Sequence, residues 1–299
     1  MSGRFAPTPS SQLHIGNLRT ALVAWLAARS SGRDFLIRVE DLDTVRYKDA
    51  EQICRSQLDD LARLGLDHDG MIVHQKDRTQ LYVEQLSRIE DLVYECFCSR
   101  KDIAEASVAP HEHRPAYPGF CRDLSDAERI HRRSQHPGAW RIRGSGATTV
   151  TDLIQGTYTA DIDDFVVRRA DGVFAYDFAV VVDDGLQEID QVVRGNDLLP
   201  SAPRQAWLAT LLGFAVPNYL HVPLVYNRDG TRLAKRDQAL SLSRLAEAGI
   251  SPAVVLSHLA ASLSLAHCGE TVTLTHLIDR FDPAKLKLQP WMVDPLNWK

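Results

Sequence analysis

A histidine and a glycine stand at the start of a predicted helix near the amino terminus, in PTPSSQLHIGNLRTAL, residues 7–22. A helix N-terminus presents unpaired backbone N–H groups and the positive end of the helix dipole, so it suits phosphate. His14 could donate to a phosphate oxygen, and Gly16 would let a nucleotide ring approach the backbone closely. A helix N-terminus with an incidental histidine explains the same pattern, so a second phosphate-directed element is needed.

That second element is the loop TRLAKR, residues 231–236, which follows a turn predicted at Asp229 and Gly230. Its three cations, Lys235 among them, could neutralise charge on a triphosphate as pyrophosphate leaves. A charge run that stands alone is usually a solvated surface. The two elements together, both on an α/β pattern, indicate nucleotide chemistry more specifically than either does.

Three of the five cysteines, Cys96, Cys98 and Cys121, lie in a stretch rich in proline, histidine and arginine. Zinc prefers four tetrahedral ligands, and structural sites favour thiolates. The Cys-x-Cys spacing in such a stretch therefore favours a metal site over three free thiols. His111 or His113 would be the ordinary choice for a fourth ligand.

Strands and helices must position these residues. The first hundred residues alternate between short apolar runs and amphipathic helical patterns. We expect a strand at residues 4–6, a helix from near Gly16 to near Gly32, and a buried strand at residues 35–39. Strand, helix and strand in this order indicate a doubly wound, parallel α/β sheet. Two more helices are expected, one with Cys54, Leu58 and Leu61 on a face and one with Tyr82, Leu86, Ile89 and Val93.

Residues 96–165 break this pattern and are expected to form an insertion with its own small fold. Beyond it, the pattern predicts an apolar strand at residues 173–182, a helix at 204–212 and a last strand at 220–225. From Leu240 onward the pattern is helical and carries no strand signal, and Cys54 and Cys268 are expected in the core on helical faces.

These expectations divide the chain into four parts. Residues 1–95 and 166–239 would be the two halves of a nucleotide-binding catalytic domain, 96–165 the insertion, and 240–299 a C-terminal helical region.

The composition is that of a globular protein, with 44% hydrophobic and 24% charged residues in a chain of 299. With 34 Lys and Arg against 39 Asp and Glu, the formal net charge is −5. This balance excludes a globally basic nucleic-acid coat but allows a local basic track. No apolar run approaches the roughly 18 residues of a membrane helix. The amino terminus also lacks a secretory signal, so we expect a cytoplasmic protein that does not bind membranes.

The chain resembles the class I aminoacyl-tRNA synthetases of the glutamyl group. Five segments carry this resemblance, in the same order from residue 3 to about residue 237. They are GRFAPTPSSQLHIGNLRTAL (3–22), IRVEDLDTVR (37–46), FAYDFAVVVDD (174–184), VVRGNDLL (192–199) and LAKR (233–236). The resemblance implies a Rossmann-like doubly wound parallel sheet with a zinc-bearing insertion and C-terminal helices, and the use of ATP with Mg²⁺.

The resemblance also implies roles for individual residues. Arg4 would pair with a substrate carboxylate, Glu40 would accept from the substrate α-ammonium, Tyr176 would close the pocket, and Arg194 would add a second cation. The implied glutamate site is Arg4, Phe5, Ala6, Pro7, Thr8, Glu40, Tyr176 and Arg194, and the implied catalytic and ATP-binding set is His14, Gly16, Asn17 and Lys235.

Two further charged residues, Arg38 and Asp41, belong to an alternating charged stretch and are weaker candidates. A stretch of this kind is usually a solvated edge.

Within the group, the chain looks like the truncated glutamyl-queuosine tRNA(Asp) synthetases. Only about 60 residues follow the LAKR loop, too few for the anticodon-binding domains of full-length relatives. Val180 stands where full-length enzymes tend to have Asn. The pattern Cys96-x-Cys98 followed by Tyr117-x-x-x-Cys121 resembles the zinc site of these paralogues and makes Tyr117 another candidate ligand. The implied partners of this chain, expected to be a monomer, are L-glutamate, ATP and queuosine-containing tRNA(Asp).

The sequence departs from the group's pattern at two positions. Asn17 replaces the last His of the HIGH-type signature, and Ala234 replaces the Ser of the loop. Asn17 can still donate a hydrogen bond, so we expect the amino acid to be activated more slowly and the enzyme to remain active. Two alternatives stay open, namely an enzyme that charges a tRNA 3′ end and an inactive paralogue that binds RNA.

Overall fold

The computed structural model describes residues 1–45, 49–99, 101–103, 117–233, 240–286, 289–294 and 298. The predictions for Lys235, Ala234, His111 and His113 lie outside these residues.

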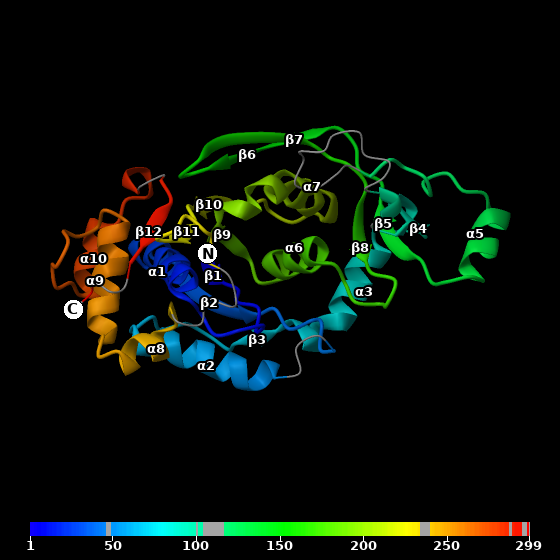
Figure 1. Ribbon diagram of the computed structural model, residues 1–299. Helices are drawn as coiled ribbons and strands as arrows, with labels where there is room; N and C mark the ends of the chain where they lie inside the picture. The colour runs from blue at the N-terminus through cyan, green and yellow to red at the C-terminus, as the bar shows by residue number, and fades with distance from the viewer. Residues whose placement is uncertain are drawn as a thin grey trace.

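A seven-stranded sheet forms the centre of the molecule (Figure 1). Its strands run in the order β3-β2-β1-β9-β10-β6-β7, and all neighbours pair in parallel except β6 and β7, which form an antiparallel hairpin. The strands are β1 (Ser2–Phe5), β2 (Asp34–Val39), β3 (Val73–His74), β6 (Ala147–Asp152), β7 (Gly156–Asp161), β9 (Ile189–Gly195) and β10 (Asn218–Val222).

The strand order confirms the predicted doubly wound topology. From β1 the chain moves outward through β2 to β3, and it later fills the other side of β1 with β9 and β10. The order therefore reverses between β1 and β9. In open α/β sheets, ligands bind at the carboxyl ends of the strands beside such a switch point.

Alternate strand residues face two different hydrophobic cores, as the pleat of a strand requires. On one face, Phe35, Ile37 and Leu220 pack with helix α1 (Ile15–Ser30). On the other, Val192 and Tyr219 pack near helix α7 (Ala202–Leu212). Both faces are covered, so polar strand residues such as Arg4, Arg38 and Arg194 are buried along with the apolar ones.

The remaining elements surround this sheet. Strands β4 (Val93–Cys96), β5 (Ala139–Ile142) and β8 (Phe165–Arg168) form a separate three-stranded antiparallel sheet, and β11 (Val225–Asn227) pairs in parallel with β12 (Trp291–Val293). In Figure 1, α5 lies at the end of the molecule opposite α9 and α10. The other helices are α2 (Ala50–Arg63), α3 (Thr79–Ser87), α5 (Asp126–Arg133), α6 (Tyr176–Leu186), α8 (Leu242–Glu247), α9 (Pro252–Ser262) and α10 (Leu274–Arg280), with short 3-10 turns η1 (Gln75–Arg78), η2 (Glu90–Leu92), η3 (Asn196–Ser201) and η5 (Pro283–Lys285).

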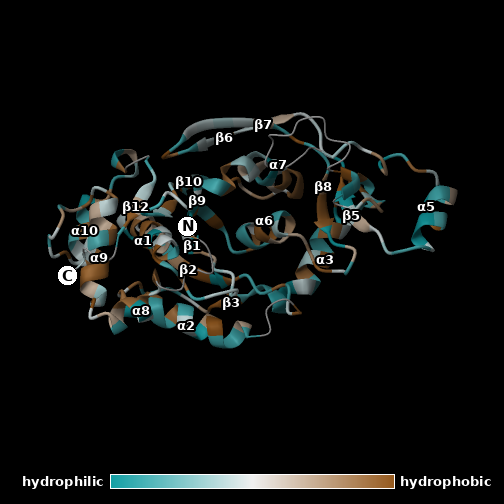
Figure 2. Ribbon diagram, in the orientation of Figure 1, coloured by the Kyte–Doolittle hydropathy of each residue, from teal (hydrophilic) through white to brown (hydrophobic). Residues whose placement is uncertain are grey.

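The strand predicted at residues 173–182 is wrong, because α6 occupies Tyr176–Leu186. Eight of its residues, Asp177 to Asp184, are buried in succession. The apolar run Phe178–Val182 fits a buried helix as well as a buried strand, and periodicity cannot distinguish the two. In Figure 2, α6 and β8 carry much of the brown of apolar residues, whereas the outlying α5 is mostly teal.

Three smaller predictions are also wrong. The helix expected to include Ile89 and Val93 ends at Ser87, and Val93 begins β4. The C-terminal region does contain a strand, β12, because β11 offers it a backbone partner that no local pattern reveals. Cys268 is exposed in a turn rather than buried on a helix. The prediction for Cys54, which is buried on α2, is confirmed.

Part of the predicted insertion extends the main sheet, because β6 pairs with β10. The four-part division of the chain stays a prediction. None of the helices in the part of the chain that the structure describes combines the length and apolar character needed to cross a bilayer.

Candidate functional site

Three of the predicted substrate residues come from adjacent parallel strands of the main sheet. Arg4 lies near the carboxyl end of β1, Glu40 directly follows β2, and Arg194 lies near the carboxyl end of β9. The backbone N–H of Glu40 donates to the carbonyl of Pro7 at 2.9 Å, so the segment after β1 is tied to the segment after β2. The sheet order therefore brings together residues that are up to 190 positions apart in the sequence.

A buried network of charges underlies these strand ends. Arg4 donates from Nε and Nη2 to the two carboxylate oxygens of Asp184, each at 3.2 Å. Arg38 on β2 reaches the same carboxylate at 2.7 Å and lies 3.6 Å from Asp183. Burial by itself raises the pKa of Asp184, but Arg38 and Arg4 hold that pKa below its usual range. Asp184 is therefore ionised and anchors both guanidinium groups.

The expectation that Arg38 and Asp41 lie at a solvated edge is wrong. Arg38 is fully buried and Asp41 is 3% exposed. Strand β2 lies inside the sheet, and α6 supplies the carboxylates that make burial of Arg38 tolerable. Asp41 in turn accepts from the backbone N–H of Lys76 at 3.0 Å and contacts Nδ1 of His74 at 2.8 Å.

Glu40 has an unusual protonation equilibrium. Its side chain is 10% exposed, and the nearest cationic nitrogen, on Arg38, is 4.0 Å away. Desolvation is the largest effect on its pKa, and although Arg38 and Arg4 oppose it, the pKa rises to about 7. A carboxyl group with this pKa ionises readily when a cation, such as an ammonium group, arrives beside it.

Arg194 is buried but has a different set of partners from Arg4. Its Nε donates to Nε2 of His221 at 2.9 Å, and its Nη1 donates to Oε1 of Gln205 at 2.6 Å. Its Nη2 donates to the carbonyl of Leu198 at 3.3 Å. Among the residues that the structure describes, no carboxylate lies within ion-pair distance of Arg194. All of these acceptors are neutral, so the guanidinium can still pair with an incoming anion.

A cavity of about 890 Å³ opens beside these strand ends. Its lining includes Thr8, Glu40 and Tyr176, and also Tyr117 and Arg141. The ring of Tyr176 keeps 38% exposure because it faces the cavity, while desolvation and then the Glu40 carboxylate raise the pKa of its hydroxyl. The cavity is at the large end of ordinary ligand pockets, so a free amino acid fills only part of it.

His14 is the N-cap of α1. Its Nδ1 accepts from the backbone N–H groups of Gly16 at 3.1 Å and Asn17 at 3.3 Å. The side-chain oxygen of Asn17 accepts from the backbone N–H of His14 at 3.1 Å, which completes a capping box. Because Nδ1 accepts, the other ring nitrogen, Nε2, carries the proton and can donate.

Gly16 lies close to the ring that forms this cap. A Cβ at Gly16 would lie 3.0 Å from Cε1 and 3.1 Å from Nδ1 of His14. A side chain there would press on the imidazole itself and shift the His14 ring by a few tenths of an ångström.

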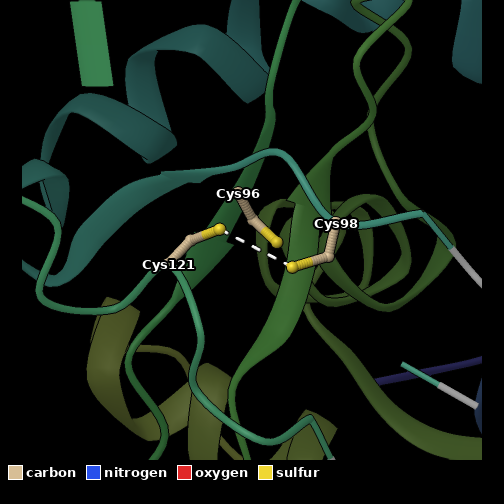
Figure 3. Close-up of side chains that lie close together, drawn as sticks. All are labelled: Cys96, Cys98 and Cys121. Atoms are coloured by element: carbon tan, nitrogen blue, oxygen red, sulfur yellow. Dashed lines mark hydrogen bonds between the residues drawn. The ribbon is translucent and has the colours of Figure 1, made fainter. Parts of the chain in front are cut away.

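The three predicted cysteines form one cluster. The sulfur atoms of Cys96, Cys98 and Cys121 lie within 4.8 Å of one another, and Figure 3 shows their side chains converging. Cys98 and Cys121 Sγ are 3.6 Å apart, and the Tyr117 hydroxyl oxygen lies 3.3 Å from Cys96 Sγ and 3.7 Å from Cys98 Sγ. A tetrahedral zinc ion needs S–S edges of about 3.8 Å and O–S edges of about 3.5 Å, given its usual bond lengths. The cluster could therefore hold a metal ion.

The surroundings of the cluster favour the anionic form of Cys121 alone. A hydrogen bond from Cys96 lowers the pKa of the Cys121 thiol to about 6, whereas the hydrogen bond to Cys121 raises the pKa of Cys96 and burial raises the pKa values of Cys98 and Tyr117. Arg132 Nη1 donates to Cys121 Sγ at 3.7 Å, and the Arg141 guanidinium lies 4.0 Å from the centre of the Tyr117 ring. These cations offset negative charge on thiolates, which are the metal-binding form of cysteine.

Sequence reasoning missed several residues that the structure places at the site. Asp184 belongs to a quoted segment, but no local signal pairs it with Arg4 on β1. His221 and Gln205, which contact Arg194, sit in an ordinary strand and helix and carry no motif. The missed residues have a common feature, because each contacts its arginine from another helix or strand, from 11 to 180 positions away in the sequence.

Comparisons with known proteins agree on one family. The family model "tRNA synthetases class I (E and Q), catalytic domain" matches residues 1–297. A Nocardia farcinica protein named Glutamyl-Q tRNA(Asp) synthetase is 53% identical over 296 residues, which cover 98% of this chain and 93% of that protein. A protein of the same name from Cutibacterium acnes is 50% identical over 88% of this chain and 76% of its own length.

One solved structure shows the same fold. The glutamate-tRNA synthetase of Elizabethkingia anophelis superposes with a TM-score of 0.82 at 23% identity, covering 99% of this chain and 68% of that one.

Proposed function

The chain belongs to the class I tRNA synthetases for glutamate and glutamine, and we propose that it activates L-glutamate with ATP and transfers it to the queuosine base in the anticodon of tRNA(Asp). The names of the relatives support this acceptor. The glutamate assignment depends on two groups of opposite charge at the carboxyl ends of strands β2 and β9. The Glu40 carboxyl group suits the substrate ammonium, and the Arg194 guanidinium, which has only neutral acceptors, suits a substrate carboxylate.

In the proposed complex the substrate lies across the carboxyl ends of β2, β1 and β9. Glu40 accepts from the α-ammonium group, and Arg194 pairs with a carboxylate. Arg4 adds a cationic contact while Asp184 holds its guanidinium. Tyr176 covers the substrate from the cavity side. Thr8 lines the cavity, and Phe5 ends β1 and packs in the core with α1. Phe5, Ala6 and Pro7 are proposed for the glutamate site on the resemblance alone.

The activation step joins the α-carboxylate of glutamate to the α-phosphorus of ATP. An oxygen of the carboxylate forms the new P–O bond, and the bond from the α-phosphorus to the bridging oxygen breaks, so pyrophosphate leaves with the electron pair. His14 Nε2 and the N-terminus of α1 stabilise the phosphate charge. Mg²⁺ bound with ATP would neutralise part of that charge. Lys235 is proposed for the same task on the resemblance alone.

The transfer step uses the remaining cavity. A hydroxyl group of the queuosine diol attacks the activated carbonyl, an ester bond forms, and AMP leaves while the hydroxyl proton is lost. We place the base that carries this hydroxyl beside Tyr117 and Arg141, which also line the cavity.

We further propose that Cys96, Cys98, Tyr117 and Cys121 hold one structural zinc ion. The Cys98–Cys121 S–S distance of 3.6 Å and the O–S distances of 3.3 and 3.7 Å from Tyr117 are close to tetrahedral edges, which supports Tyr117 as the fourth ligand. A zinc ion there would cross-link the end of β4 to the segment that carries Tyr117 and Cys121, beside the cavity.

Two assays test the proposed function. Glutamate-dependent exchange between ATP and pyrophosphate is expected without any tRNA, and transfer of labelled glutamate is expected only to queuosine-containing tRNA(Asp). Absence of exchange would indicate an inactive RNA-binding paralogue. Equal labelling of queuosine-free tRNA(Asp) would refute the proposed acceptor and support charging of a 3′ end.

A further inference from the structure

A second pair of buried residues lies behind Arg194. Nδ1 of His221 on β10 is 2.6 Å from Oδ2 of Asp152 at the end of β6, and both side chains are fully buried. The other ring nitrogen of His221 contacts Arg194 Nε at 2.9 Å. The imidazole thus stands between a carboxylate and a guanidinium, on three neighbouring strands of the sheet.

The hydrogen bonds determine the tautomer of His221. An arginine Nε–H can only donate, so Nε2 of His221 must accept and Nδ1 must carry the proton. That proton is then donated to Asp152. Burial, the largest effect, lowers the pKa of His221, which agrees with a neutral ring.

Asp152 is itself held in place by the backbone. Its Oδ1 accepts from the N–H groups of Ile154 at 2.8 Å and Gln155 at 2.7 Å, and its Oδ2 accepts from the N–H of His221 at 2.9 Å. The orientation of His221, and through it that of Arg194, is therefore imposed by the sheet and by the turn after β6.

We infer that Asp152 and His221 are positioning residues that hold the Arg194 guanidinium ready for a substrate carboxylate. A direct partner such as Asp184, which binds Arg4 through both oxygens, would occupy the edge of the guanidinium. In contrast, Asp152 does not contact Arg194 and offsets its charge at a distance, through the neutral imidazole of His221 that lies between them. The cation is then stabilised in a buried place, and N–H groups remain for the substrate.

This inference rests on the proposed function and extends it to the choice between glutamate and glutamine. The N–H groups that Arg194 presents to the substrate need an acceptor. The side-chain carboxylate of glutamate accepts through both oxygens. The side-chain amide of glutamine has one oxygen and one NH₂ group, and an NH₂ group that faces the N–H donors of Arg194 leaves a buried polar group without a hydrogen bond. Asp152 and His221 keep Arg194 in the orientation that makes this distinction.

The test uses three variants of the full chain and one control. His221→Phe keeps the size of the ring but removes both nitrogens, Asp152→Asn removes the carboxylate charge, and His221→Gln restores an acceptor near the Nε2 position. Asp190→Asn, the control, loses an ion pair with Arg33 of 2.8 Å near the other end of β9. Exchange kinetics are measured for glutamate and glutamine, and folding is checked by thermal unfolding.

For His221→Phe and Asp152→Asn we expect the KM for glutamate to rise about tenfold or more, the loss expected for a hydrogen bond to a charged group. The values of kcat and of KM for ATP should stay within about threefold, and the preference for glutamate over glutamine should fall. His221→Gln should recover part of the KM, and Asp190→Asn should match the wild type. A general structural defect would instead lower kcat and leave the preference unchanged.

The outcomes separate this inference from the proposed function. If the wild type shows no glutamate-dependent exchange, the proposed function fails. If the wild type is active and folded His221→Phe has an unchanged KM and preference, only the positioning role is refuted. Failure of both His221→Phe and Asp152→Asn to fold would assign the pair a structural role and contradict the inference. Nitrogen NMR of the wild-type imidazole gives a ligand-free check, because a protonated Nε2 on His221 would overturn the geometry.

Discussion

The pH dependence of glutamate binding offers a direct test of Glu40. Desolvation raises its pKa to about 7 in the free protein, against the opposing effect of Arg38 and Arg4. Only the ionised carboxylate can pair with the substrate ammonium group. Since a carboxyl group loses its charge as the pH falls, glutamate affinity is expected to fall as the pH falls through 7.

The magnitude follows from this pKa. About one-eleventh of Glu40 is ionised at pH 6 and about ten-elevenths at pH 8, so the apparent Kd for glutamate should be about tenfold weaker at pH 6. The other groups around Glu40 keep their charge over this interval. Arg4 and Arg38 stay cationic, Asp184 has a lowered pKa, and Tyr176 has a raised one. Free glutamate also keeps its charge state between pH 6 and 8.

The assay is calorimetric titration of glutamate into the protein at several pH values, without ATP, so that groups which act on ATP do not contribute. Glu40→Gln, which removes the titrating group and keeps its shape, is expected to bind glutamate weakly and with the same Kd at pH 6 and pH 8. A wild-type Kd that is constant over this interval would refute the reasoning. An equal pH dependence in Glu40→Gln would assign the titration to another group.

Three further predictions concern the helix cap, the cysteine cluster and the charge network. Gly16→Ala should slow adenylate formation about tenfold with little change in the Kd for glutamate, because the alanine Cβ would lie 3.0 Å from the His14 ring. Stopped-flow measurement of pyrophosphate release checks this rate. Cys121→Ala, or treatment with a strong chelator, should release about one zinc ion per chain by elemental analysis and lower the Tm, since a structural ion contributes folding free energy. Asp184→Asn should reduce the free energy of unfolding, measured in urea, by about 3 kcal/mol or more, because the guanidinium groups of Arg4 and Arg38 lose their shared counter-ion. A reduction below about 1 kcal/mol would contradict a stabilising role for this charge network.

Much of the fold could be predicted from local patterns. The helix after His14 and the strand at Asp34–Val39 appear where the spacing of apolar residues and the stop near Gly32 place them. The parallel, doubly wound sheet follows from the alternation of these elements. Periodicity failed at α6, because a helix buried on all sides shows no polar face. It failed again at β12, a strand of three residues that pairs with β11.

The candidate site divides in the same way. The sequence by itself determined the residue types, since the HIGN segment, the VED segment and the Cys-x-Cys spacing name His14, Glu40 and the thiols directly. Tertiary structure decided how those residues are charged and held. Asp184 meets Arg4 across 180 positions, and His221 meets Asp152 across 69. Strand order and helix packing create such contacts, and they leave no periodic signal in the chain. For that reason the resemblance can name Arg194 as a candidate, whereas only the folded sheet shows that its guanidinium contacts an imidazole that is itself bonded to Asp152.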